Sequence, residues 1–567
     1  MGGCITIPCL LPTSPLPFIK MLRIPVLLLF ASLMGGSGDP VAPLAAPDPG
    51  NVDGDQIRIE VVPLGPDQEE IDSFMDDLKD GALAPLAGSN WRLLRFRFTP
   101  HEKGVPEIGT PFRAEGFDYD GSFGFALTGD MENPADVVFQ ILDGQPRPSV
   151  DEFLAAVETV SADPDLGPMI RSGDYQPVRP MPELFYDPSR PGDRVIGVGI
   201  IPLKDGLDPV TVGVNFSSNL LVHYAPASPY FPLASSACNP PPSAGGSGGG
   251  SGSASVTIFL GNTEIWAFKM TRPAASSGTW GSGIDLEDVR FRGKNVLNQA
   301  HVPINCVLYD NNACGPYRDW QDEENAFQAS GRDLASGIRH AFGGASTVLD
   351  SQNDSGNFHG VAVYRDGNEV VLKSECSAGW YRYCPQWRFG VDGTIKAWWG
   401  FEAVQNSCTC RAHTHHCYFR FDFNLGDGTN SFYEYNGSMG NWTSTHLATE
   451  QSRDRNAATF RHWRVTDPDS GDTYAIAPGD FFGHHVDGEV DSYGEGDTWF
   501  LQYKSNQIDD SGQGWGTGPH LDNFINGESV DNTDVVMWYG NHFRHDHNDP
   551  NFNATKIVGP RLIPLVW

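Results

Sequence analysis

The stretch HGVAVYRDGNEVVL, from His359 to Leu372, decides the fold class, because apolar and polar residues alternate on both sides of an Asp-Gly-Asn turn. Alternation with a period of two predicts strands with one buried face, and a short turn between them predicts an antiparallel hairpin. The bursts DTWFLQYKS and ATFRHWRV repeat the pattern. We therefore expect a large antiparallel β-sandwich over residues 256–567, in which 322–342 is the one stretch with a helical pattern.

The chain upstream of the sandwich predicts two small α+β domains. Residues 56–148 hold an acidic stretch with spaced apolar residues at 67–80, which is typical of a helix, and the strand-like WRLLRFRFTP follows it. Residues 149–235 begin with a serine that can cap a helix and continue into apolar, strand-like runs. A Pro-, Gly- and Ser-rich stretch at 236–255 predicts a flexible linker. The expected fold is mainly β, with a large sandwich preceded by two small α+β domains.

The first 38 residues have the pattern of a targeting region. MLRIPVLLLFASLMGGSG carries a basic residue, a short apolar run and small residues, which is the order of a secretory signal, and the run is too short to span a membrane. Residues 39–55 are rich in Pro, Ala and Asp and predict a flexible mature N-terminus. We therefore expect a secreted or periplasmic protein without a membrane span.

An exported chain predicts disulfides among the cysteines that follow the signal. These are Cys238, Cys306, Cys314, Cys376, Cys384, Cys408, Cys410 and Cys417. Sequence alone leaves their pairing open.

The charge balance limits the classes of partner. The sequence has 38 Lys and Arg against 71 Asp and Glu, a formal net charge of −33, which disfavours binding to nucleic acid and favours attraction of cations. The sequence contains no phosphate loop, dinucleotide fingerprint or serine nucleophile elbow. Its chemistry must therefore come from another set of residues.

Two histidines two residues apart predict a metal site. His413 and His415 in RAHTHHCYFRFDF would project from one face of a strand, so both imidazoles can bind one ion, although a structural role explains the spacing equally well. A third imidazole can come from DNTDVVMWYGNHFRHDHND, which offers His542, His545 and His547 after an apolar strand. Three imidazoles with open positions suit Cu(II) or Zn(II).

These segments resemble the copper amine oxidases. GWYRYCPQWRFGVDGTI follows, without a gap, the family's pattern of a cofactor tyrosine and an aromatic-rich strand, and Tyr381 falls on that tyrosine. The family's His-x-His, with Arg-x-Asp five residues after the second histidine, is similar to the run from His413 to Asp422. DNTDVVMWYGNHF looks like the strand that carries the third copper histidine, so the resemblance makes His542 the expected third ligand.

The resemblance implies a cofactor and an activity for the sandwich, which would be the catalytic domain. Copper and O₂ would oxidise Tyr381 to topaquinone, which would then convert a primary amine and O₂ to an aldehyde, ammonia and hydrogen peroxide. Tyr309 falls where the family has a tyrosine that hydrogen-bonds the cofactor. Asp422, Asn424 and Asp534 fall on positions that bind calcium in many members, with solvated turn residues as the alternative, and a homodimer is expected.

The sequence departs from the family at the catalytic base. Gln328 stands where the family has Asp, and an amide cannot usefully accept the substrate proton. One of the acids just before it would have to substitute: Asp322, Glu323 or Glu324. Trp380 and Arg382 also replace the amide and the acid that flank the cofactor tyrosine. Arg382 would either favour an oxyanion or cap the exposed side of the strand.

Two functions are consistent with these residues. The leading one is copper- and quinone-dependent oxidative deamination of a primary amine, with Tyr381 as the oxidised residue and Tyr383 as a core-packing residue on the same face of the strand. The alternative is a catalytically silent or rewired homologue that binds copper or a partner, which the departures at Gln328, Trp380 and Arg382 favour.

Overall fold

The structure is a computed structural model that describes residues 57–567 apart from gaps at 100–102, 104–108, 181–182, 203–209, 225–239, 241–251, 277–282, 310–316, 320–322, 406–407, 439–440, 480–489, 511–517 and 547–555. The expected signal region, the flexible N-terminus and most of the expected linker lie outside the described residues. Among the described residues, every helix is too short or too polar to traverse a lipid bilayer.

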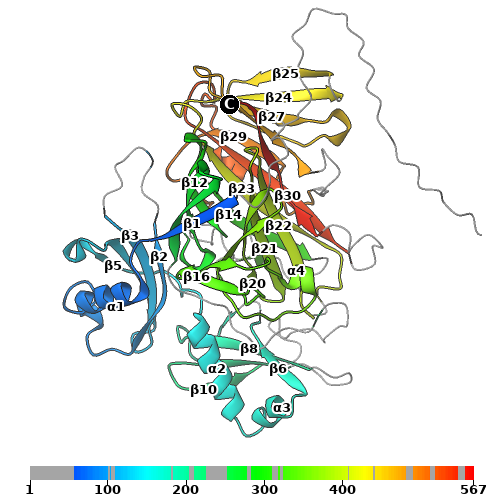
Figure 1. Cartoon of the computed structure of the whole chain (residues 1–567). Helices are drawn as coiled ribbons and strands as arrows, with labels where there is room; N and C mark the ends of the chain where they lie inside the picture. The colour runs from blue at the N-terminus through cyan, green and yellow to red at the C-terminus, as the bar shows by residue number, and fades with distance from the viewer. Residues whose placement is uncertain are drawn as a thin grey trace, which may run out of the picture. The chain divides into compact units, whose positions relative to one another are not determined.

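Two large β-sheets hold most of the strands of the described chain (Figure 1). The ten-stranded sheet has the order β1 (Ile57–Leu64), β11 (Ser253–Leu260), β12 (Thr263–Thr271), β13 (Asp285–Phe291), β14 (Lys294–Tyr309), β23 (His413–Phe423), β30 (Val535–His545), β29 (Thr498–Gln502) and β26 (Gln451–Arg453), with β15 (Tyr317–Arg318) paired to β14. 

The thirteen-stranded sheet has the order β16 (Gly331–Ala335), β17 (Ile338–Ala341), β18 (Val361–Asp366), β19 (Glu369–Lys373), β21 (Tyr381–Gly390), β22 (Ile395–Ala403), β32 (Arg561–Val566), β28 (Thr473–Ala477), β27 (His462–Thr466), β24 (Ser431–Ser438) and β25 (Asn441–Leu447). Its two remaining strands are β20 (Cys376–Ala378), which pairs with β21, and β31 (Ile557–Val558), which pairs with β22. The short helix α4 (Val348–Ser351) lies between β17 and β18 in the sequence.

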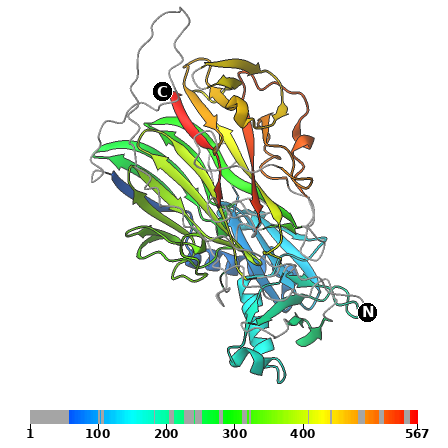
Figure 2. The same cartoon turned by 90° about the vertical axis from the view of Figure 1, so that its right-hand side faces the viewer.

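The two large sheets share one hydrophobic core, which confirms the predicted sandwich (Figure 2). Trp266 comes from the ten-stranded sheet and Trp387 and Trp399 come from the thirteen-stranded sheet, and all three are fully buried. Burying one large apolar side chain stabilises a fold by about 1.5–3 kcal/mol, so this shared core holds the two sheets together.

The hairpin predicted at His359–Leu372 is confirmed, because β18 and β19 pair antiparallel around the Asp-Gly-Asn turn. The helix predicted over 322–342 is wrong. Its second half forms the antiparallel strands β16 and β17, and Gly337 in the turn between them has a φ of +63°, which favours glycine and breaks a helix.

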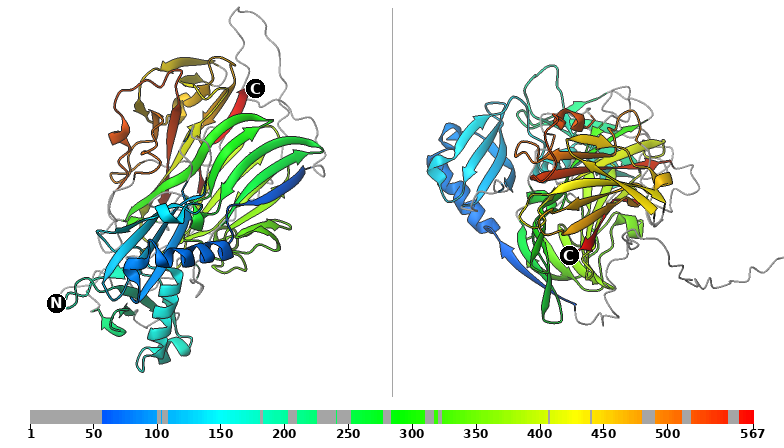
Figure 3. Two further views of the ribbon diagram at one scale, coloured as in Figure 1. Left: turned by 90° about the vertical axis from the view of Figure 1, so that its left-hand side faces the viewer. Right: turned by 90° about the horizontal axis from the view of Figure 1, so that it is seen from above.

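The first strand of the described chain belongs to the sandwich. β1 pairs antiparallel with β11 along its whole length, from Ile57 opposite Leu260 to Leu64 opposite Ser253, and Figure 3 shows it in blue beside the green strands. The sequence had placed residue 57 in the first small domain and residues up to 255 in the linker. In the structure, β1 is the edge strand of the ten-stranded sheet and β11 is its neighbour.

Two smaller sheets carry the helices. Helix α1 (Gln68–Asp77) packs on a four-stranded sheet of β2 (Trp91–Phe98), β3 (Pro111–Asp118), β4 (Phe123–Asp130) and β5 (Val138–Ile141). Helices α2 (Val150–Ala162) and α3 (Gly167–Arg171) pack on a five-stranded sheet of β10 (Leu220–His223), β9 (Val210–Asn215), β8 (Val195–Pro202), β6 (Tyr175–Val178) and β7 (Leu184–Phe185). Both small units are α+β, as the sequence predicts.

The N-terminus of α2 shows why the helix begins where predicted. The Ser149 hydroxyl accepts a hydrogen bond from the Glu152 N–H at 3.1 Å, and the Glu152 carboxylate accepts one from the Ser149 N–H at 3.0 Å. This capping box satisfies two N–H groups that the helix leaves without partners.

The cysteines differ from the expectation. Cys306, Cys376, Cys384 and Cys417 are buried thiols rather than disulfides. Cys408 and Cys410 are disulfide-bonded. Cys238 and Cys314 lie outside the described residues. The expected disulfides are therefore absent at four of the six described cysteines and present at two.

Candidate metal centre

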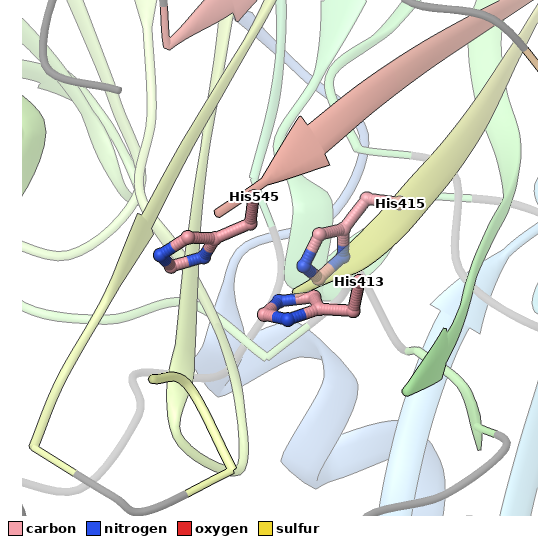
Figure 4. Close-up of side chains that lie close together, drawn as sticks. All are labelled: His413, His415 and His545. Atoms are coloured by element: carbon pink, nitrogen blue, oxygen red, sulfur yellow. The ribbon is translucent and has the colours of Figure 1, made fainter. Parts of the chain in front are cut away.

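Three buried histidines meet between the two large sheets. His413 and His415 extend from β23, and His545 lies directly opposite His413 on β30. Each offers a ring nitrogen within 4.8 Å of the others, and Figure 4 shows the three imidazoles turned toward one another. All three side chains are buried. The predicted same-face pair is therefore present, and β30 supplies the third imidazole.

The predicted third histidine is corrected from His542 to His545. In the β23–β30 register His542 lies opposite His416, so both side chains project from the other face of the sheet. The His542 Nδ1 atom lies 2.8 Å from the His416 Nδ1 atom. The spacing of three residues between His542 and His545 explains the error, because an odd shift along a strand moves a side chain to the opposite face.

Tyr381 lies at the three histidines. It opens β21 in the opposite sheet and is 1% exposed. The His413 Nδ1–H donates to the Arg411 carbonyl at 2.5 Å, so the His413 Nε2 atom keeps its lone pair and accepts from the Tyr381 hydroxyl at 2.6 Å. The Tyr381 oxygen also contacts the His545 Nδ1 atom. The phenol oxygen therefore lies where the nitrogens of two histidines converge.

Tyr383 also reaches the centre, which corrects the expectation that it only packs in the core. Its ring stacks on that of Tyr381 at 5.7 Å between centroids, so the predicted common face is confirmed. Its hydroxyl donates to the Asp319 carboxyl and accepts from the His415 Nδ1–H at 3.1 Å. Burial raises the pKa of Asp319 to about 7. Sequence reasoning missed Asp319, which lies outside the family pattern.

Tyr309 lies beside the centre, at the end of β14. It pairs with His413 in the sheet register, and its ring centroid lies 4.2 Å from that of His413. Its hydroxyl accepts a hydrogen bond from the Trp380 Nε1–H at 2.7 Å. Trp380, which departs from the family pattern, therefore holds the tyrosine that the resemblance assigns to the cofactor.

The structure gives Gln328 a partner that is not one of the residues of the centre. Its side chain is exposed and donates to the Ser355 carbonyl at 3.4 Å. Glu324 is bound by the Arg272 guanidinium, and Glu323 by those of Arg147 and Arg179. Asp322 lies outside the described residues. Gln328 does not occupy the position of a base, and both described acids before it are neutralised by arginines.

Arg382 projects to the face of β21 opposite Tyr381. Its guanidinium donates to both oxygens of Asp354 at 2.8 Å, and both residues are buried. Asn325 also donates to Asp354 at 2.8 Å. Arg382 thus neither caps an exposed side nor contacts the Tyr381 hydroxyl, and burial raises the pKa of Tyr381 well above its usual value.

Two of the three residues expected to bind calcium contact the ammonium group of Lys103 instead. Lys103 Nζ lies 2.5 Å from an oxygen of Asp422 and 2.5 Å from an oxygen of Asp534, and its side chain is only 14% exposed. The side-chain oxygen of Asn424 lies beside Gly428 instead. Because Lys103 already supplies the positive charge, these residues do not fit a calcium ion as they stand.

The chemistry of the three histidines fits copper. Burial holds the pKa of His415 well below its usual range, and the neighbouring histidines add to the effect, so its imidazole is neutral and can act as a ligand. Its Nδ1–H donates to Tyr383, while the buried Nε2 atom has no hydrogen-bond partner. An unsatisfied buried lone pair beside two other imidazoles is typical of a metal ligand set, and three imidazoles suit Cu(II).

The fold is that of the copper amine oxidases. An amine oxidase from Aspergillus nidulans matches with a TM-score of 0.53 at 13% identity over 88% of this chain and 87% of that chain. The lysyl oxidase of Pichia pastoris matches with a TM-score of 0.51 at 12% identity over 89% of both chains. A copper-containing benzylamine oxidase from Hansenula polymorpha matches with a TM-score of 0.50 at 13% identity over 90% and 93%. No protein-family model and no curated protein sequence matches the chain.

Proposed function

We propose that this protein is a copper-dependent oxidoreductase in which Tyr381 becomes a quinone that oxidises primary amines with O₂. One observation carries the proposal. The Tyr381 hydroxyl lies in a buried site, in contact with the His413 Nε2 and His545 Nδ1 atoms, and His415 completes the cluster. His413, His415 and His545 would hold the copper ion.

Copper held by His413, His415 and His545 would, with O₂, supply the oxidising chemistry that converts the Tyr381 ring to a quinone able to react with a primary amine. The chain's own residues prepare this position. Tyr383 stacks on one side of the Tyr381 ring, and the pair is fully buried, so bulk water is excluded from the ring. Tyr309 packs against His413 and, with the Trp380 indole, limits the freedom of that imidazole.

We propose Asp319 as the residue that accepts the substrate proton. Among the described residues, four buried carboxyls near β21 are bound by cations or amides. Glu324 pairs with Arg272, Glu402 with Lys556, Asp354 with Arg382, and Glu375 accepts from the Asn325 amide. Asp319 accepts from the Tyr383 hydroxyl, and its pKa of about 7 lets it gain or lose a proton near neutral pH. It therefore takes the role that the sequence pattern assigns to position 328.

We also propose an extracytoplasmic location. The pattern of the first 38 residues supports it, and so do the disulfide-bonded residues Cys408 and Cys410, because disulfides persist in oxidising compartments. A homodimer remains a proposal that rests on the family resemblance.

The visible spectrum of protein loaded aerobically with Cu²⁺ tests the function. A quinone absorbs visible light and tyrosine does not, so we expect a new band in the wild type and in Tyr383→Phe, and none in Tyr381→Phe. A wild type that binds copper and stays colourless apart from the copper bands would overturn the quinone.

The second candidate is a copper-binding protein without amine turnover. The exposure of Gln328 and the arginine partners of Glu323 and Glu324 favour it, because they remove the acids that the sequence offers as a base. A visible band without peroxide production from any primary amine would support this alternative.

A further inference from the structure

A second pair of buried histidines lies on the opposite face of the strands that carry the first centre. His416 on β23 and His542 on β30 are cross-strand neighbours, and both are fully buried. Their Nδ1 atoms are 2.8 Å apart. The proposed function uses neither residue. The hydrogen-bond partners of the two imidazoles indicate why the pair is buried.

A carboxylate holds the far nitrogen of each ring. The His416 Nε2 atom lies 3.0 Å from an oxygen of Asp491, and the His542 Nε2 atom lies 3.2 Å from an oxygen of Asp497 and 3.1 Å from the Gly496 carbonyl. Carboxylate and carbonyl oxygens only accept, so both Nε2 atoms carry the hydrogen and donate it. The two Nδ1 atoms therefore face each other across a space that holds either a proton shared by the two rings or a metal ion.

We propose that the Nδ1 atoms of His416 and His542 bind a second divalent transition-metal ion, of the kind that imidazole prefers, such as Zn(II) or Cu(II). Two lone pairs at 2.8 Å repel each other unless a positive charge lies beside them. Two nitrogens about 2.0 Å from one ion lie about 2.8 Å apart when their bonds to it are at right angles and about 3.3 Å apart in a tetrahedral site, so the observed spacing is close to that of two adjacent ligands. A carboxylate that receives the other N–H of a ligating histidine is a common arrangement around metal ions.

Charge and space at the pair also suit a cation. Asp491 and Asp497 bring two negative charges, of which one is offset by the Arg455 guanidinium at 2.8 Å from Asp497. Gly494 lies against the His416 ring, and a Cβ atom at this position would lie 2.5 Å from the His416 Nδ1 atom. A residue without a side chain therefore leaves free the space beside the nitrogen that would bind the ion.

Zinc uptake by the metal-free protein tests this site without any use of amine oxidation. Dialysis against Zn²⁺ followed by elemental analysis should find two equivalents in the wild type, one at each face of the sheet. His542→Gln should lower the content to one equivalent, because glutamine can still donate to Asp497 but offers no imidazole. His545→Gln is the matched control and should remove the other equivalent.

A second variant keeps the test valid if His542→Gln does not fold. Gly494→Ala keeps both histidines in the chain but places a Cβ atom against the His416 Nδ1 atom, which has to shift, so it should also lower the content to one equivalent. Uptake of one equivalent by the wild type, unchanged in His542→Gln and Gly494→Ala, would overturn the proposal and show that the pair shares a proton. Two equivalents that both variants retain would also overturn it. Neither result tests whether Tyr381 becomes a quinone, because Tyr381 contacts His413 and His545 on the other face of the sheet.

Discussion

Replacing Asp319 by asparagine tests whether this carboxyl is set to exchange a proton near neutral pH. Asp319 is 3% exposed, and burial raises its pKa to about 7. The usual value is about 3.9, and the difference corresponds to about 4 kcal/mol between the two protonation states. The folded protein therefore binds a proton that the unfolded chain has already released between about pH 4 and about pH 7.

The sign of the effect follows from this difference. The unfolded state holds fewer protons in that range, so the free energy of unfolding of the wild type falls as pH rises through it. Asparagine cannot ionise, but its side-chain oxygen can still accept from the Tyr383 hydroxyl. The stability of Asp319→Asn relative to the wild type should thus increase by up to about 4 kcal/mol between about pH 4 and about pH 8.

Urea unfolding of the metal-free protein at several pH values measures this difference. Asp350→Asn is a matched control of opposite sign: burial acts to raise the pKa of Asp350, but Lys373 and the hydrogen bonds of Thr347 outweigh it and lower the pKa. That variant should lose stability relative to the wild type only as pH rises to about 4, and should run parallel to it from about pH 5 to about pH 8. If the Asp319→Asn and wild-type stabilities run parallel from about pH 4 to about pH 8, the buried, proton-exchanging carboxyl does not exist as described.

Four further predictions follow from the site. Asp319→Asn should slow peroxide production from primary amines by about 10²- to 10⁴-fold while leaving carbonyl-reagent labelling of Tyr381 intact, and equal loss of both would place Asp319 in another role. His545→Gln should abolish that labelling and His542→Gln should keep it, and the reverse pattern would restore His542 as the third ligand. Gln328→Asp should leave amine oxidation unchanged, because the side chain is exposed and bonds the Ser355 carbonyl, so a gain would return the base to this position. Lys103→Met should lower the free energy of unfolding by about 3–5 kcal/mol, partly recovered by Ca²⁺, and stabilisation of the wild type by Ca²⁺ would show that Lys103 does not occupy the cation position.

The sequence predicts the sandwich because its strands alternate strongly and its turns carry glycine. The hairpin at residues 359–372 is local in the chain, so its pairing follows from the pattern alone. The pairing of β1 with β11 joins segments about two hundred residues apart, and no local pattern reports such a contact. The helix predicted at 322–342 is wrong for a related reason. In a short stretch broken by polar residues, the apolar positions fit the helical period of 3.6 and the strand period of two equally well.

The candidate site was predictable where it depended on spacing and not where it depended on register. The i, i+2 spacing of His413 and His415 places both on one face, as the structure shows. The choice between His542 and His545 depended on how β30 aligns with β23, which the sequence does not report. Asp319 lies outside the family pattern, and only the fold brings it to Tyr383.

The same limit applies to the calcium prediction. The family resemblance alone marks Asp422 and Asp534 as a pair of acids, one on β23 and one directly before β30. The cation that neutralises them comes from Lys103, more than three hundred residues earlier in the chain. A lysine in an unrelated segment carries no sequence signal for this role, so an acidic pair predicts the need for a cation but not its source.

Peptide mapping after aerobic copper loading tests the central claim most directly. The loaded protein is treated with phenylhydrazine, digested and analysed by mass spectrometry, with Tyr381→Phe as the control. We expect the label on the peptide that contains Tyr381, located on that residue by fragmentation, and no label on the control. An unmodified Tyr381 in protein that holds copper at His413, His415 and His545, or a label on Tyr383 instead, would contradict the account.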